Sequence, residues 1–158
     1  MSLREQPGTT HTRAATDREQ QIERLLGRWQ QAMERKDAAA AAACYTDDAV
    51  LFDLAPPLRE RGMNQRALQA WLDSWSTGPM YQMRDVQLIT DENIAYCLSS
   101  THMAGTKTAG EQVDLWFRAT VCLRRSGGEW LIAHEHISVP FLMDGSFKAA
   151  VNLRPQDH

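Results

Sequence analysis

The sequence has few cysteines and no long apolar run, and each of these absences excludes a class of protein. Its three cysteines, Cys44, Cys97 and Cys122, are widely spaced and form no CxxC pair. We therefore expect neither a disulfide framework nor a zinc knuckle. No apolar run approaches the roughly 20 residues that span a bilayer, so we expect no membrane segment. The first residues also lack the apolar core of a signal peptide, which predicts a cytoplasmic protein.

Basic residues are also scarce. The 17 Lys and Arg residues are outnumbered by 20 Asp and Glu residues, which gives a formal net charge of -3. Because no basic stripe is present, we expect no nucleic-acid partner. Apolar residues make up 43% and charged residues 23% of the chain, as in an ordinary globular domain. We find no internal repeat, and we expect a mobile polar tail over residues 1–15 and a single domain over residues 16–155.

The chain has helical periodicity in its first half and alternation in its second half. Apolar spacing predicts a helix from about Asp17 to Arg35, a short alanine-rich helix capped by Asp37, and a third helix over residues 64–76. The expected strands are residues 49–54, 80–90, 94–106, 113–125 and the segment that follows Gly128. This order predicts an α+β fold, with three N-terminal helices packed on an antiparallel sheet.

The last strand, within GEWLIAHEHISVPF, has an unusual polar face. Alternation predicts that one face carries Trp130, Ile132, His134, His136 and Ser138. On the preceding strand, Arg118 and Thr120 also share a face. If the two polar faces meet in a hairpin, Arg118 and Thr120 lie beside the histidines, which requires a loop with an odd number of residues, such as Ser126-Gly127-Gly128. A two-residue loop would instead place Arg118 opposite Ile137. Glu135 then falls on the mostly apolar face, and this pairing does not explain it.

Four sequence features carry a family resemblance. They are Asp37, the YTDDA segment that leads into the first strand together with Gly62, the strand WFRATVCLRR and the strand HEHISVPF. From about residue 17 to 155 the chain resembles the SnoaL-like, ketosteroid-isomerase-like branch of the nuclear transport factor 2-like superfamily. The resemblance implies a cystatin-like α+β roll, in which a strongly bent antiparallel sheet forms a cone with a hydrophobic pocket at its open end. It also implies a homodimer packed through the sheet.

The resemblance transfers the catalytic pattern of the family only in part. The aspartate that abstracts a proton in ketosteroid isomerases matches Asp53, whose apolar neighbours favour a basic carboxylate. The alternative is a loop aspartate that bonds backbone amides before Pro56. The oxyanion tyrosine of the family falls at Trp29 and its oxyanion aspartic acid at Thr120, so ketosteroid isomerisation itself is not expected.

The histidines and Arg118 are the other candidates for chemistry. His134 and His136 could act as acid or hydrogen-bond donor, and Arg118 could bind a carboxylate or an oxyanion. Alternatively, both histidines are structural, or they form a three-histidine metal site with His102. Because no spacing places His102 beside the pair, we expect neither a metal nor a cofactor. For Arg118 the alternative is a salt bridge to a nearby carboxylate.

Two functional hypotheses follow. The first is a cofactor-free acid–base enzyme, of isomerase, dehydratase or cyclase type, that acts on a small, partly apolar organic molecule. The second is a non-catalytic dimeric ligand-binding or interaction module. The predicted catalytic residues are Asp53, Arg118, His134 and His136, and the predicted ligand-binding residues are Trp71, Trp75, Tyr81, Trp116, Thr120 and Ser138. We expect Asp53, Arg118, Thr120, His134, His136 and Ser138 to converge on one cavity.

Overall fold

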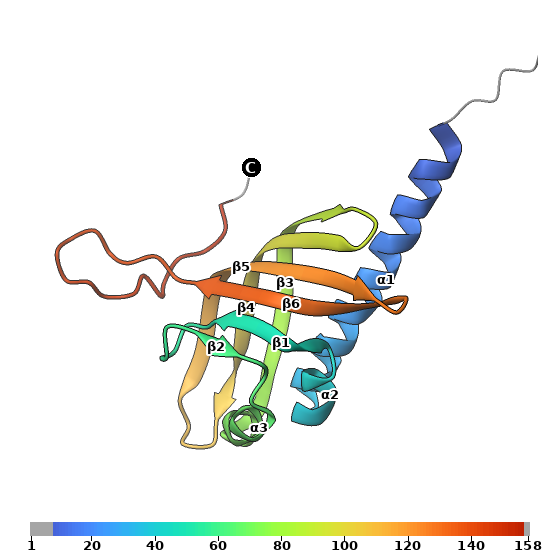
Figure 1. Ribbon diagram of the computed structural model, residues 1–158. Helices are drawn as coiled ribbons and strands as arrows, with labels where there is room; N and C mark the ends of the chain where they lie inside the picture. Colours follow the sequence, from blue (N-terminus) through green and yellow to red (C-terminus); the bar gives the residue numbers. More distant parts are fainter. Residues whose placement is uncertain (1–7, 157–158) are drawn as a thin grey trace, which may run out of the picture.

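The computed structural model describes residues 8–156, and within this range it contains three helices and one six-stranded sheet (Figure 1). The helices are α1 (Gly8–Glu34), α2 (Ala38–Ala42) and α3 (Gln65–Asp73). The strands are β1 (Tyr45–Phe52), β2 (Glu60–Arg61), β3 (Trp75–Thr90), β4 (Ile94–Lys107), β5 (Gln112–Ser126) and β6 (Glu129–Ser138). The predicted α+β class is confirmed. No described helix is long and apolar enough to cross a membrane.

The helix boundaries follow local capping chemistry. The Asp37 side chain accepts a hydrogen bond from the Ala40 amide at 3.0 Å and caps α2, as predicted. Asn64 caps α3 in the same way through the Ala67 amide. Helix α1 differs from the expectation, because it begins at Gly8. Residues 8–15, expected in a polar tail, are therefore helical, and residues 1–7 lie outside the described part of the chain.

The sheet is mixed, which corrects the prediction of a wholly antiparallel sheet. Its strand order is β2-β1-β6-β5-β4-β3. Strand β1 runs parallel to β6 and antiparallel to β2, and β3 to β6 form an antiparallel meander. Alternation along β1 predicts a strand, but it does not predict which strand lies beside it. The long crossover from β1 to β6 therefore had no signal in the sequence.

The β5–β6 hairpin has a shorter loop than expected and contains a β-bulge. Gly127 and Gly128 form a two-residue loop with φ of 59° and 81°, as a type I′ turn requires. Farther along, Leu123 lies opposite Ile132 but Cys122 lies opposite His134, so β6 contains one extra residue at this point. The bulge reverses the alternation of β6.

As a result, β6 does not have the single polar face that alternation predicted. Trp130 and Ile132 face the helices, whereas His134 and His136 face the opposite side. We call the side that faces α1 the core face and the other side the outer face. Across the sheet, one core-face row is Leu51, Glu135, Val121, Cys97 and Leu88, and the next row, on the outer face, is Phe52, His136, Thr120, Leu98 and Gln87.

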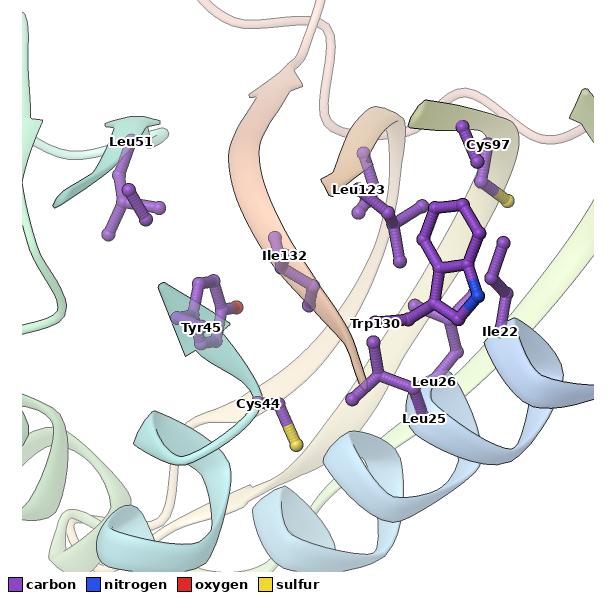
Figure 2. Packing of buried hydrophobic residues seen from close by; sticks show 13 residues of the cluster. Ile22, Leu25, Leu26, Cys44, Tyr45, Leu51, Cys97, Leu123, Trp130 and Ile132 are labelled. Atoms are coloured by element: carbon purple, nitrogen blue, oxygen red, sulfur yellow. The ribbon is translucent and has the colours of Figure 1, made fainter. Parts of the chain in front are cut away.

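The core lies between α1 and the core face of the sheet. Ile22, Leu25 and Leu26 of α1 pack against Trp130 and neighbouring strand residues (Figure 2). The indole N–H of Trp130 donates to the Gln21 side chain at 3.1 Å, which satisfies the only polar group of this buried ring. A second buried cluster occupies the other half of the core face and contains Met33, Leu72, Tyr81 and Phe117, among others. Trp29 packs against both clusters.

Candidate functional site

A carboxyl group lies on the core face, at a position where alternation predicts an apolar residue. Glu135 of β6 is partly buried, and its Oε2 accepts a hydrogen bond of 2.6 Å from the hydroxyl of Tyr45, the first residue of β1. Burial raises the pKa of Glu135, and the Asp53 carboxylate raises it further. The Tyr45 hydrogen bond favours the charged form and lowers this pKa. Burial thus disfavours the charged form of Glu135, and the hydrogen bond from Tyr45 offsets part of this effect.

Two buried phenols accompany Glu135. Tyr45 is 5% exposed, and burial followed by the adjacent Glu135 carboxylate raises its pKa well above the ordinary value. The pKa of Tyr81 is raised for the same reasons, with an added contribution from Asp53. Both phenols therefore stay protonated at neutral pH and act as hydrogen-bond donors. The ring of Tyr81 also packs against Trp29, with 5.0 Å between ring centroids.

Asp53 directly follows β1 and is exposed. Its Oδ1 accepts a hydrogen bond of 2.6 Å from the Leu54 amide, which is the backbone contact that the structural alternative predicted. Asp53 nevertheless acts electrostatically on Glu135 and Tyr81. We call Asp53, Glu135, Tyr45 and Tyr81 the core-face cluster.

The two phenols of the core-face cluster belong to different hydrophobic clusters. Tyr45 belongs to the cluster around Trp130. Tyr81 belongs to the second cluster, against which partly buried apolar side chains pack: Leu68, Trp71, Met103, Leu115, Ala119, Ile137 and Val139. A surface hollow of about 390 Å³ between α2, β1 and Gly62 includes Tyr45 in its lining. Glu135, Asp53 and Tyr81 do not line this hollow, so Tyr45 is the member of the cluster that connects it with the core face.

The other predicted catalytic residues lie on the outer face. Arg118 donates from Nε to the Ser138 hydroxyl at 3.1 Å rather than to a carboxylate. Thr120 lies opposite His136, and the Nδ1 of His134 lies 2.6 Å from the Val50 carbonyl oxygen. The polar faces of β5 and β6 do meet, as predicted. The bulge, however, places them on the side of the sheet opposite the core-face cluster, so the expected convergence with Asp53 is not formed.

The remaining predicted residues also lie partly on the outer face and partly in the core. Trp116 stacks on His102 on the outer face, with 4.8 Å between centroids. The Nε2 of His102 lies 2.6 Å from Asp114 Oδ1, so His102 does not join the other two histidines. Among residues 8–156, no three metal-ligating side chains form a group. Trp75 is 1% exposed and is a core residue, and the Trp71 ring contacts it edge-on.

Sequence reasoning named Asp53 and Tyr81 but missed Tyr45 and Glu135. A signal for Glu135 existed, because a carboxylate at an apolar-face position needs a buried partner. The partner could not be identified, since the parallel β1–β6 pairing that brings Tyr45 near β6 was not predicted.

Comparison with known proteins agrees with this fold. No curated protein matches the chain. A solved NTF2-like protein of unknown function from Pseudomonas putida KT2440 is 28% identical, covers 89% of this chain and 99% of its own, and has a TM-score of 0.76. A ketosteroid isomerase-like protein from Erwinia carotovora atroseptica SCRI1043 is 26% identical, with a TM-score of 0.60 and coverage of 75% and 92%. A protein with a cystatin-like fold from Caulobacter vibrioides is 18% identical, with a TM-score of 0.64 and coverage of 76% and 87%.

The family assignment covers most of the chain. Residues 22–142 match the SnoaL-like domain family. This range contains the core-face cluster and all six strands. The match confirms the resemblance that the YTDDA, WFRATVCLRR and HEHISVPF segments carry, and the chain therefore belongs to the SnoaL-like domain family.

Proposed function

We propose that the core-face cluster binds a small, partly apolar organic molecule and catalyses proton transfer on it, with Glu135 as the acid–base group. The observation that carries this proposal is the hydrogen bond of 2.6 Å between the Glu135 carboxyl group and the Tyr45 hydroxyl on the core face. A carboxyl group whose pKa is raised by burial exchanges protons closer to neutral pH than an exposed one.

Each member of the cluster has a chemical role in this proposal. Glu135 takes a proton from a carbon next to a carbonyl group, or from a hydroxyl group. Tyr81 donates a hydrogen bond to the oxygen on which negative charge develops. Tyr45 holds Glu135 in place, and the Asp53 carboxylate keeps Glu135 basic. Return of the proton to another carbon gives an isomerisation, and loss of a hydroxyl group gives a dehydration.

Deuterium exchange tests this proposal without knowledge of the natural substrate. A panel of cyclic ketones and β-hydroxyketones is incubated with the protein in D₂O, and exchange of the hydrogens next to the carbonyl is followed by NMR. The native protein should accelerate exchange for some members of the panel. Glu135→Gln keeps the size of the side chain but removes the basic carboxylate, and it should slow exchange on the order of 100-fold or more.

The matched control is Glu129→Gln, the same change at the exposed start of β6. It should leave exchange unchanged. Equal exchange rates in the native protein and the Glu135→Gln variant would contradict the acid–base role. A change in the tryptophan fluorescence of the protein on addition of a member of the panel, with no exchange in any sample, would instead support the non-catalytic binding module.

We also propose that two copies of the chain pair through the outer face. Several apolar side chains are exposed on β3 and β4, and they include Ile89, Ile94, Tyr96 and Leu98. Exposed apolar patches commonly mark interaction surfaces. The helices cover only the core face, and the outer face is therefore available to a second copy.

A further inference from the structure

We propose that His134 and His136 form a two-histidine chelating site for one transition-metal ion on the outer face. This site is separate from the core-face cluster and does not depend on the proposed acid–base function. The ion would be of the borderline class that prefers imidazole nitrogen, such as Ni²⁺, Zn²⁺ or Cu²⁺. Water molecules would complete its coordination.

The positions of the two rings suit one shared ion. Residues two apart on a strand point to the same face, and the His134 and His136 ring centroids are 6.4 Å apart. An ion bound at about 2.1 Å from one nitrogen of each ring, with tetrahedral or cis-octahedral angles, would hold the two centroids roughly 4.5 to 5.5 Å apart. A small rotation of His136 closes this difference, because its side chain is exposed and has no hydrogen-bond partner among the described residues.

The hydrogen bond of His134 leaves a nitrogen free for the ion. A carbonyl oxygen only accepts, so the 2.6 Å contact with Val50 places the ring proton on Nδ1 and a lone pair on Nε2. A backbone carbonyl commonly fixes the tautomer of a metal-binding histidine in this way. The Phe52 ring packs edge-on against both imidazoles, with centroid distances of 4.9 Å to His134 and 5.3 Å to His136. These contacts restrict the orientation of the two rings on the outer face.

The neighbouring residues limit the site to two protein ligands. His102 is bonded to Asp114 and stacked on Trp116. Cys122 lies opposite His134, but among residues 8–156 no three His, Cys, Asp or Glu side chains lie close enough together to hold one metal ion. Arg118 lies opposite Ser138, two residues beyond the Thr120–His136 pair on the same face, and its positive charge weakens binding of any cation. We therefore expect modest affinity and selectivity for imidazole-preferring ions over Mg²⁺ and Ca²⁺.

Calorimetric titration of the untagged protein with Ni²⁺ tests the proposal. The native protein should bind one Ni²⁺ per chain at this site, and His136→Ala should weaken that binding on the order of 100-fold because the chelate is lost. His136→Gln is a second variant of similar size, which guards against an effect on folding. The matched control, His102→Ala, should bind Ni²⁺ as the native protein does.

NMR locates the ion independently. Paramagnetic Ni²⁺ should broaden the ring signals of His134, His136 and Phe52 before those of His102. Unchanged affinity in both His136 variants, or an equal loss in His102→Ala, would overturn the proposal. Glu135→Gln should retain Ni²⁺ binding, so failure of the acid–base function and failure of the metal site give different results.

Discussion

At the scale of single residues, two opposing effects act on the pKa of Glu135. Burial disfavours its charged form, and the phenol of Tyr45 compensates in part with one short hydrogen bond. A hydrogen bond to a charged group contributes about 1.5 to 3 kcal/mol to stability, more than a neutral one. Tyr45 is therefore the residue on which the charge state of Glu135 depends most directly.

Tyr45→Phe removes this hydrogen bond and changes little else. We expect it to lower the free energy of unfolding by about 1 to 3 kcal/mol, because the buried carboxylate loses its partner. Urea denaturation at neutral pH measures this change. The control is Tyr96→Phe on the outer face, where the side chain is 43% exposed, and its effect should stay within about 0.5 kcal/mol. Equal effects of the two changes would contradict a hydrogen bond to Glu135.

The raised pKa of Glu135 also predicts how stability depends on pH. The pKa in the folded protein lies above the value of about 4.3 for an unfolded chain. The contribution of Glu135 to stability is therefore fully present below pH 4.3 and is lost as pH rises through the folded pKa. Relative to Glu135→Gln, the native protein should lose stability over this range and level off above it. Denaturation midpoints of both proteins across pH check this, and a constant difference would contradict the prediction.

Individual residues show why the site was only partly predictable from sequence. The family resemblance predicts Asp53, which matches the catalytic aspartate of ketosteroid isomerases, and the aromatic ring of Tyr81 suits the wall of the implied pocket. Glu135 was identified as unexplained, since the sequence shows the polarity of a position but not its partner. Tyr45 gave no signal, because its partner is ninety residues away along the chain and lies on a strand whose parallel pairing was not predicted.

At the scale of secondary structure, the bulge in β6 determines which residues share a face. The bulge lies at Ala133, between Ile132 and His134, where no glycine or proline marks it. Strict alternation therefore predicts that all even-numbered residues from 130 to 138 share one face. In the structure, alternation holds before the bulge and again after it, but the two parts place their even-numbered residues on opposite faces. Helix ends gave stronger signals, because Asp37 and Asn64 are capping residues.

Strands β3 and β4 approach each other closely at Gly105, and this close approach can be tested. Gly105 of β4 lies against the backbone of β3, and an added Cβ would overlap the Thr77 carbonyl oxygen and lie 3.0 Å from the Trp75 ring. Gly105→Ala should therefore lower the free energy of unfolding by about 1 to 3 kcal/mol. The control is Gly27→Ala within α1, where a Cβ meets nothing within 4 Å.

Alanine favours a helix by about 1 kcal/mol over glycine, so Gly27→Ala should be stabilising. Thermal and urea unfolding of both variants measure the change in the free energy of unfolding, which should fall for Gly105→Ala and rise for Gly27→Ala. A neutral Gly105→Ala would show that β3 and β4 approach each other less closely than the structure describes.

At the scale of the whole molecule, the order of elements predicted the α+β class, because helices precede a run of alternating segments. The mixed sheet was not predictable, since pairing between β1 and β6 depends on contacts across most of the chain. We assign different proposed functions to the two faces of the sheet. We propose chemistry on the core face, and pairing of copies and metal binding on the outer face.

The proposed pairing of copies predicts the mass of the protein in solution. Light scattering at micromolar concentration should give the mass of a dimer. Leu98→Arg places a charge in the apolar outer-face patch and should shift the protein towards monomer. Met143→Arg is the control, because Met143 is 96% exposed and lies after β6, away from the strands of that patch. A monomeric native protein, or equal effects of both changes, would contradict pairing through the outer face.

The most direct test of the central proposal is a titration of the Glu135 side-chain carboxyl by ¹³C NMR. We predict a midpoint above the ordinary glutamate value of about 4.3, because burial and Asp53 both raise the pKa of Glu135. We also predict a lower midpoint in Asp53→Asn, because the neighbouring negative charge is removed. A midpoint at the ordinary value that does not respond to Asp53→Asn would contradict the assignment of Glu135 as the acid–base group.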